Sequence, residues 1–119
     1  MLDVGTGTGQ WAYEVARAFS FAQVVGLDLE PPIIPTWEAP LNYQFVQADL
    51  RHGLSFADHT FDFVHQRLLG AALRASSWTH VISELVRITR PGGYIDLLEI
   101  TDTLLTEGAS DQTASCLVA

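Results

Sequence analysis

The stretch Leu2-Asp3-Val4-Gly5-Thr6-Gly7-Thr8-Gly9 decides the fold. Leu2 to Val4 is short and mostly apolar, as in a buried strand, and it runs directly into a turn with a glycine at every second position. A helical pattern follows, with apolar side chains on one face at Trp11, Ala12, Val15, Ala16 and Phe19. Glycines between a strand and a helix permit a tight turn and let a ligand approach the backbone. The stretch therefore predicts a strand–turn–helix unit with a ligand at the turn.

Four further segments have the composition of strands. They are Gln23 to Leu29, Tyr43 to Val46, Phe61 to His65 and Tyr94 to Ile100. The first is a β-branched apolar run of the kind found in strands that are buried on both faces. A proline-rich loop, with Pro31, Pro32, Pro35 and Pro40, follows it and cannot be helical.

A second helix is predicted between the fourth and fifth strands. Ser76 or Ser77 could cap its start, and Pro91-Gly92-Gly93 ends it. Its core face would carry Val81, Ile82, Leu85, Val86 and Ile88. From Thr103 to Ala119 the sequence is small and polar, without a clear period, so residues 101–119 are left as an unassigned tail after a core at 1–100.

This alternation of strands with helices and loops predicts the α/β class. We expect a doubly wound, mostly parallel sheet between two helical layers, which is a three-layer αβα sandwich of the Rossmann-like kind. Such sheets bind ligands beyond the carboxyl ends of their strands, beside the first strand.

Composition narrows the function. At 119 residues with 48% hydrophobic and 17% charged, the chain suits one globular domain. Its net charge is −8 and its six basic residues are all arginine, so direct nucleic-acid binding, Schiff-base chemistry and a Walker lysine are not expected. No apolar run approaches the roughly 20 residues that span a bilayer, so no membrane association is expected. The single cysteine, Cys116, fits an intracellular protein of the cytoplasm or nucleus.

The glycine turn differs from the usual dinucleotide-binding pattern. In G-x-G-x-x-G the last glycine packs the helix on the strand, but here that position is Gln10 and the third glycine comes early, at Gly9. An oxidoreductase domain that binds a nicotinamide cofactor is therefore disfavoured, although it stays open as an alternative.

Two acidic residues follow strands at positions where a nucleoside could be held. Asp28 ends the second strand, about 20 residues past the turn, where an acid can accept hydrogen bonds from ribose hydroxyls, with Glu30 as the fallback. Asp49 follows the third strand and could accept from an exocyclic adenine amine, with Leu50 against the ring. The competing interpretation of Asp49 is a helix N-cap.

The run His65-Gln66-Arg67-Leu68-Leu69 follows the fourth strand and should project toward the site. His65 could act as a general base, but a histidine at a strand end is more often packed or hydrogen-bonded, so no catalytic side chain is nominated. The histidines, at 52, 59, 65 and 80, have no metal-ligand spacing, and we expect no metal.

Five motifs in order resemble the class I S-adenosylmethionine-dependent methyltransferases. They are LDVGTGTG at 2–9, VVGLDLE at 24–30, FVQADL at 45–50, FDFVHQRLL at 61–69 and RPGGYIDLLE at 90–99. Trp11-Ala12, the proline-rich loop and the FDFVHQR run are similar to fungal members of the family that resemble the velvet-associated regulator of secondary metabolism.

The resemblance implies S-adenosylmethionine as cofactor and a seven-stranded sheet with the order 3-2-1-4-5-7-6. Asp3 and the turn would hold the methionine part, Asp28 the ribose, Asp49 and Leu50 the adenine, and Gln66 would lie near the methionine end. The implied cofactor-binding residues are Asp3, Gly5, Thr6, Gly7, Gly9, Asp28, Leu29, Asp49, Leu50 and Gln66. The implied reaction is direct displacement, in which an acceptor atom attacks the sulfonium methyl. The acceptor, a small molecule or a protein, is not identified.

The chain departs from the family pattern at both ends. The helices that usually precede the first strand are missing, and no clear sixth or seventh strand follows the fifth. These departures predict a fragment that is marginally folded and weakly active alone. They also leave open a non-catalytic protein of the same fold that acts through regulatory protein partners.

Overall fold

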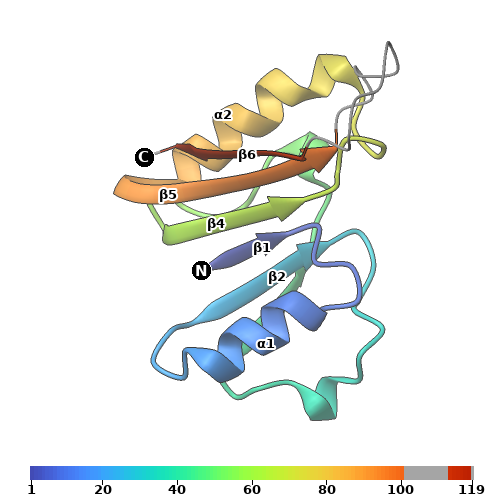
Figure 1. Ribbon diagram of the computed structural model, residues 1–119, viewed down its shortest axis with the longest axis vertical. Helices are drawn as coiled ribbons and strands as arrows, with labels where there is room; N and C mark the ends of the chain where they lie inside the picture. Colours follow the sequence, from blue (N-terminus) through green and yellow to red (C-terminus); the bar gives the residue numbers. More distant parts are fainter. Residues whose placement is uncertain (101–112, 119) are drawn as a thin grey trace.

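The computed structural model describes residues 1–100 and 113–118, and these form a twisted sheet with helices packed against it (Figure 1). The first half of the chain contains β1 (Leu2–Val4), α1 (Gln10–Ala18), β2 (Val24–Asp28) and β3 (Tyr43–Gln47). The second half contains β4 (Phe61–Arg67), α2 (Trp78–Ile88), β5 (Thr89–Ile100) and β6 (Thr113–Val118). Short 3-10 helices lie in the connections, at η1 (Thr36–Glu38), η2 (Leu50–His52) and η3 (Ala75–Ser77). In this described part of the chain, no helix has the length and apolar character needed to cross a membrane.

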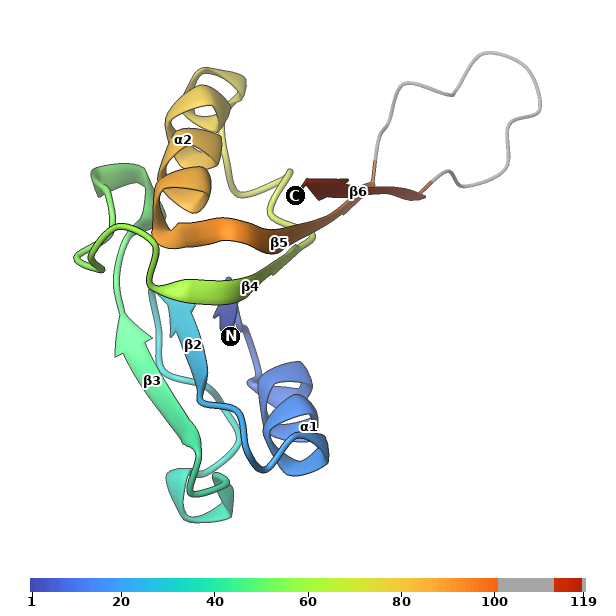
Figure 2. The same cartoon turned by 90° about the vertical axis from the view of Figure 1, so that its left-hand side faces the viewer.

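The strands lie in the order β3-β2-β1-β4-β5-β6. The first five pair in parallel, and β6 pairs antiparallel with β5. The predicted order 3-2-1-4-5 and the mostly parallel sheet are confirmed. Helices α1 and α2 pack on opposite faces of the sheet, which confirms the three layers (Figure 2). β1 lies at the centre of the sheet, so the turn that follows it emerges in the middle of the carboxyl edge.

The hydrophobic core lies mainly between the sheet and α2. Leu2, Val4, Leu27 and Val64 contribute from the strands, and Val81, Leu85 and Ile88 contribute from the helix. A smaller cluster beneath α1 is built on Ala12, Ala16 and Val24. Because side chains alternate along a strand, Leu2 and Val4 enter the larger core while Asp3 faces the α1 side.

Two element boundaries differ from the predictions. β4 continues through Arg67, so the first three residues of the run at 65–69 lie inside the strand. β5 begins at Thr89, which pairs with Phe61 before the register shifts and Tyr94 pairs with Phe63. β5 therefore begins before Pro91, where the sequence predicted the end of the helix. It begins there because Thr89 already pairs with β4.

Two further predictions need correction. Ser77 precedes α2, but its side chain makes no capping hydrogen bond, and η3 leads into the helix instead. A sixth strand exists at residues 113–118, where the sequence showed none. Its register is set by pairing with β5, which local periodicity does not reveal.

Arg87 on α2 ties the connection at residues 54–58 to the helix. Its guanidinium donates to both carboxylate oxygens of Glu84 (2.8 and 2.9 Å), to Asp58 (2.9 Å) and to the carbonyls of Leu54 and Phe56 (2.9 and 2.8 Å). The hydrogen bonds that Glu84 accepts from the Arg87 guanidinium and from the Leu54 N–H lower the pKa of Glu84 to about 2.

We predict that Arg87→Met lowers the free energy of unfolding by about 2–3 kcal/mol in urea at pH 7, since it removes the donor to two carbonyls and two carboxylates. The matched control is Arg90→Met, which removes an arginine paired with Asp62 at the surface and should cost less than about 1 kcal/mol. Equal losses in the two variants would contradict the role of Arg87.

The contribution of Glu84 should depend on pH. Its pKa in the folded chain lies below the ordinary value of 4.5, so its ionised form stabilises the fold at neutral pH, and this stabilisation is lost as the pH falls from about 4.5 toward 2. The difference in unfolding free energy between the wild type and Arg87→Met should shrink over that range. A difference that stays constant from pH 7 to pH 2.5 would contradict the prediction.

Candidate functional site

Two cavities open at the carboxyl ends of the strands and meet at Gly5. The β2 cavity, about 160 Å³, is lined mainly by apolar side chains that include Leu27, Leu50 and Leu69. The β4 cavity, about 420 Å³, is mostly polar and is bounded by the glycine turn, the first turns of α1 and the end of β4. The predicted position of the ligand site, beside the first strand, therefore coincides with two adjoining spaces of opposite character.

The glycine turn has positive φ angles at Gly5 (71°), Gly7 (57°) and Gly9 (85°), where other residues are strained. A Cβ at Gly5 would lie 2.7 Å from the side chain of Leu69, and one at Gly9 would lie 3.0 Å from Pro32. At Gly7, the nearest atom would be the Gly5 carbonyl oxygen at 4.0 Å. A side chain at Gly5 or Gly9 would thus meet neighbouring side chains, whereas Gly7 borders open space at the β4 cavity.

Most of the backbone N–H groups of this turn donate to acceptors inside the protein. The N–H groups of Gly5 and Thr6 donate to the carbonyl of Leu27 (2.8 and 3.0 Å), and the Gly7 N–H donates to Asp28 Oδ2 (2.8 Å). Phosphate-binding turns direct such N–H groups at the ligand. This turn therefore offers close approach to a ligand without the donors that hold a phosphate.

Asp28 stands at the end of β2, as predicted, and lines the β2 cavity. Its two oxygens accept from the N–H groups of Gly7 (2.8 Å) and Leu29 (2.7 Å). A carboxylate has about four lone-pair positions, so the side chain can accept further hydrogen bonds from a ligand.

Asp3 is buried beneath the β4 cavity and accepts a hydrogen bond from Thr6 Oγ1 (2.7 Å). Burial raises the pKa of Asp3, and the hydroxyl of Thr6 and the charges of His65 and Arg67 partly oppose that effect. A cation placed in the cavity would further favour the ionised carboxylate.

Asp49 lines the β2 cavity, but it also caps η2 by accepting from the Arg51 N–H (3.0 Å). The Arg51 guanidinium, 2.6 Å from Asp49 Oδ2, lowers the pKa of this carboxyl. The capping interpretation of Asp49 is thus observed, and a contact with adenine would have to share the carboxylate with Arg51.

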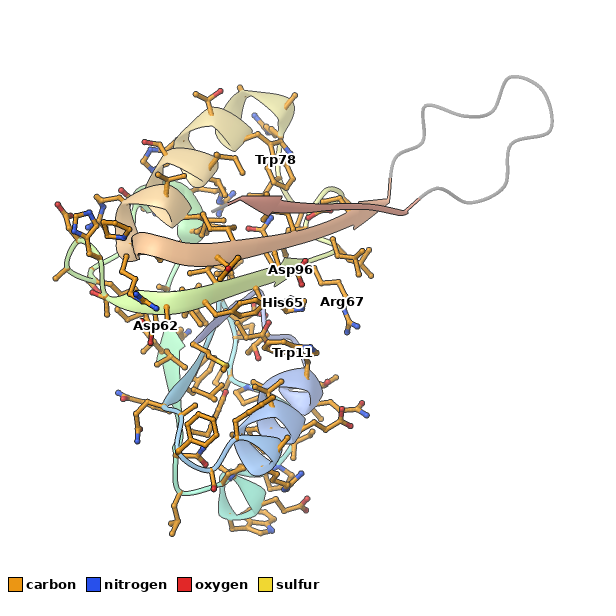
Figure 3. All side chains as sticks on the ribbon, turned by 60° about the vertical axis from the view of Figure 1, so that its left-hand side comes forward. Trp11, Asp62, His65, Arg67, Trp78 and Asp96 are labelled. Carbon is orange, nitrogen blue, oxygen red and sulfur yellow. The ribbon has the colours of Figure 1, made fainter. Side chains whose placement is uncertain are left out.

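His65 is packed. Its ring stacks on Trp11 of α1, with 3.9 Å between ring centroids and 13° between planes, and its Nδ1 lies 3.0 Å from Asp96 Oδ2 (Figure 3). The side chain forms part of the β4 cavity wall, but one ring face and one nitrogen are already engaged. The geometry favours a structural role over that of a free general base.

The predicted site residues gather around the two cavities, with two exceptions. The β4 cavity is lined by Asp3, Gly5, Thr6 and Gly7, and the β2 cavity by Gly5, Asp28, Leu29, Asp49 and Leu50. Gly9 borders neither cavity and begins α1. Gln66 also borders neither, because it is fully buried and its Nε2 donates to Glu99 (3.3 Å).

Other lining residues were not nominated as binding residues, although Arg67 and Leu69 belong to the run at 65–69 that was expected to project toward the site. In the β2 cavity these residues are Leu69, Ala72 and Leu73, from the segment after β4, and in the β4 cavity they include Trp11, Glu14 and Arg67. The signal for Arg67 was the alternation along β4, which puts residue 67 on the same face as residue 65.

Glu99, on β5, holds the segment that walls the β2 cavity. Its carboxylate accepts from the backbone N–H groups of Leu69 (3.1 Å) and Gly70 (2.8 Å). Among residues 1–100 and 113–118, no cluster of three or more His, Cys, Asp or Glu side chains could hold a metal ion.

Comparisons with known proteins agree on one family. A family model described as a methyltransferase domain matches residues 1–93. Methyltransferase pytC of Aspergillus terreus is 37% identical over 109 residues, which cover 90% of this chain and 32% of that protein. Secondary metabolism regulator laeA of Coprinopsis cinerea is 38% identical over 99 residues, covering 82% of this chain and 24% of that protein. The chain thus spans about a third or less of the length of these curated relatives.

The fold is also shared with solved structures. The PH0226 protein of Pyrococcus horikoshii OT3 superposes with a TM-score of 0.70 and 26% sequence identity, over 83% of this chain and 48% of that one.

We predict that Glu99→Gln loosens the wall of the β2 cavity, because an amide nitrogen would replace one of the two acceptors that now face N–H groups. Hydrogen exchange at Leu69 and Gly70 should accelerate by about tenfold or more, a change equivalent to roughly 1.4 kcal/mol. Glu30→Gln, the same charge change at an exposed loop acid, should leave both amides unchanged. Unaltered protection in Glu99→Gln would show that other contacts hold this segment.

Proposed function

Because this chain belongs to the methyltransferase domain family, we propose that it binds S-adenosylmethionine at the glycine turn and forms the cofactor-binding part of a methyl-transfer enzyme. The observation that carries the proposal is the chemistry around that turn. Most of its N–H groups are used internally, two carboxylates flank it, and an apolar and a polar cavity meet at Gly5.

The groups that surround the glycine turn fit the parts of this cofactor. Asp28 retains acceptor positions for ribose hydroxyls, and the apolar walls of the β2 cavity suit a planar base. The β4 cavity, with Asp3 at its base, suits the charged amino-acid end. The cofactor has a positive sulfonium and no phosphate, which matches a turn that provides carboxylates in place of free N–H groups.

The protein's part in the reaction is to bind and orient. Bound S-adenosylmethionine supplies a methyl group on sulfur that an acceptor oxygen, nitrogen, sulfur or carbon atom can attack. Holding the two reactants in line can supply much of the rate by itself. We assign no proton transfer to a side chain of this segment, since His65 is engaged by Trp11 and Asp96. The acceptor, a small molecule or a protein, is bound by groups that we do not assign.

The same chemistry argues against a nicotinamide dinucleotide. Its pyrophosphate needs convergent N–H donors, and it would meet the carboxylates of Asp3, Asp28 and Glu14 around the turn.

A second candidate is a regulatory protein of the same fold with protein partners. It is favoured by the 38% identity with a relative named as a secondary metabolism regulator. Cofactor binding without methyl transfer to any acceptor in a cell extract, by a longer protein that contains this chain, would support it over the enzyme.

We predict that calorimetry detects binding of S-adenosylhomocysteine, and that Asp28→Ala weakens it by about ten- to a hundredfold, through loss of charge-assisted hydrogen bonds to the ribose. Asp28→Asn, which keeps one acceptor oxygen, should fall between. Glu30→Ala is the control, since Glu30 is the next acid along the chain and is exposed. If Glu30→Ala loses affinity for S-adenosylhomocysteine and Asp28→Ala does not, the ribose contact belongs to Glu30.

We also predict that Gly7→Ala folds but binds S-adenosylhomocysteine at least about tenfold more weakly. Its methyl group meets no protein atom closer than 4.0 Å, so the cost to folding is the positive φ, about 1 kcal/mol, while the methyl occupies the space where the ligand should approach. Gly26→Ala is the contrasting variant, because its Cβ would overlap the Tyr43 hydroxyl and destabilise the fold itself. Normal affinity in folded Gly7→Ala would move the ligand away from the turn.

A further inference from the structure

Arg67 is the one arginine among the described residues that line the β4 cavity. It lies two residues beyond His65 on the same face of β4, and its side chain projects from the strand end on the side of Trp11 and His65 (Figure 3). Within residues 1–100 and 113–118, its guanidinium makes no hydrogen bond and no ion pair shorter than 4 Å. By contrast, Arg51, Arg87 and Arg90 are each paired with a carboxylate.

The charges around this cavity have a definite arrangement. Asp3 and Glu14 are carboxylates, and Arg67 is a permanent cation whose charge favours the ionised form of Asp3. His65 is already engaged by Trp11 on one ring face and by Asp96 at Nδ1, which leaves the Arg67 guanidinium to meet an anionic group. A cavity with both signs of charge suits the zwitterionic form of an α-amino acid, which carries an ammonium and a carboxylate on one carbon atom.

We propose that Arg67 binds the α-carboxylate at the amino-acid end of the cofactor, while Asp3 supplies the negative charge for its ammonium. The inference rests on the proposed function and deepens it. A guanidinium holds a carboxylate through two parallel hydrogen bonds, so Arg67 makes the site specific for nucleosides that carry an amino acid. Nucleosides without one would bind only through the β2 cavity and Asp28.

The test compares two ligands that differ in this end alone. S-adenosylhomocysteine carries the amino acid, and 5′-methylthioadenosine has a methyl group in its place. Calorimetry measures both affinities for the wild type, Arg67→Met, Arg67→Lys and the control Arg74→Met, which removes an arginine that borders neither cavity.

The wild type should bind S-adenosylhomocysteine at least about tenfold more tightly than 5′-methylthioadenosine. Arg67→Met should weaken S-adenosylhomocysteine by roughly ten- to a hundredfold and leave 5′-methylthioadenosine unchanged. Arg67→Lys should recover part of the preference, and Arg74→Met should alter neither affinity. The salt dependence of S-adenosylhomocysteine binding should also fall in Arg67→Met.

Each other result has a definite meaning. A wild type that binds neither ligand overturns the proposed function itself. A wild type that prefers S-adenosylhomocysteine, together with an Arg67→Met variant that keeps the preference, overturns only the role of Arg67. Equal losses for both ligands in Arg67→Met overturn it as well, because they indicate a distorted site.

Discussion

The site depends on the backbone of the turn between β1 and α1, which has positive φ angles at Gly5, Gly7 and Gly9. This conformation lets the chain leave the central strand, reverse within a few residues and begin a helix against the α1 face of the sheet. It also brings the Gly7 N–H to Asp28 at the end of the neighbouring strand, so the turn and β2 form one rigid rim. The two cavities exist because this rim passes between them at Gly5.

Because side chains alternate between the two faces of a strand, residues that build the core lie on one face of the sheet and residues near the ligand site lie on the other. In β1, which has three residues, Leu2 and Val4 enter the large core under α2 and Asp3 faces the α1 side. The register places Asp3 beside His65 of β4, and His65 beside Asp96 of β5. A polar row thus runs across the middle of the sheet on one face while the other face supplies most of the buried apolar surface. The α1 face can carry charged groups near a ligand because stability comes mainly from the opposite face.

The parallel sheet, the two helices and the position of Asp28 could be predicted from the sequence, because each depends on a local pattern that ends in a recognisable turn. The strand order came from the resemblance to the family and not from a local pattern. The features that were missed depend on contacts between distant segments. β6 forms by pairing with β5, and β5 starts early because Thr89 pairs with Phe61. The run at 65–69 was expected to project toward the site, but Arg67 was not singled out in it, because its alternation with His65 follows only when β4 continues through residue 67. Gln66 was carried over from the family pattern, but its position on the α2 face buries it against Glu99.

The most direct test of the ligand site is an NMR titration of the uniformly ¹⁵N-labelled chain with S-adenosylhomocysteine, with NAD⁺ in a parallel titration. Binding at the junction of the two cavities predicts the largest amide shifts at Gly5, Gly7, Leu29 and Leu50, with little change at the opposite end of the sheet around Gly92, and no comparable shifts with NAD⁺. Shifts that cluster away from the glycine turn, or that appear equally with NAD⁺, would contradict a site built for a nucleoside that carries an amino acid.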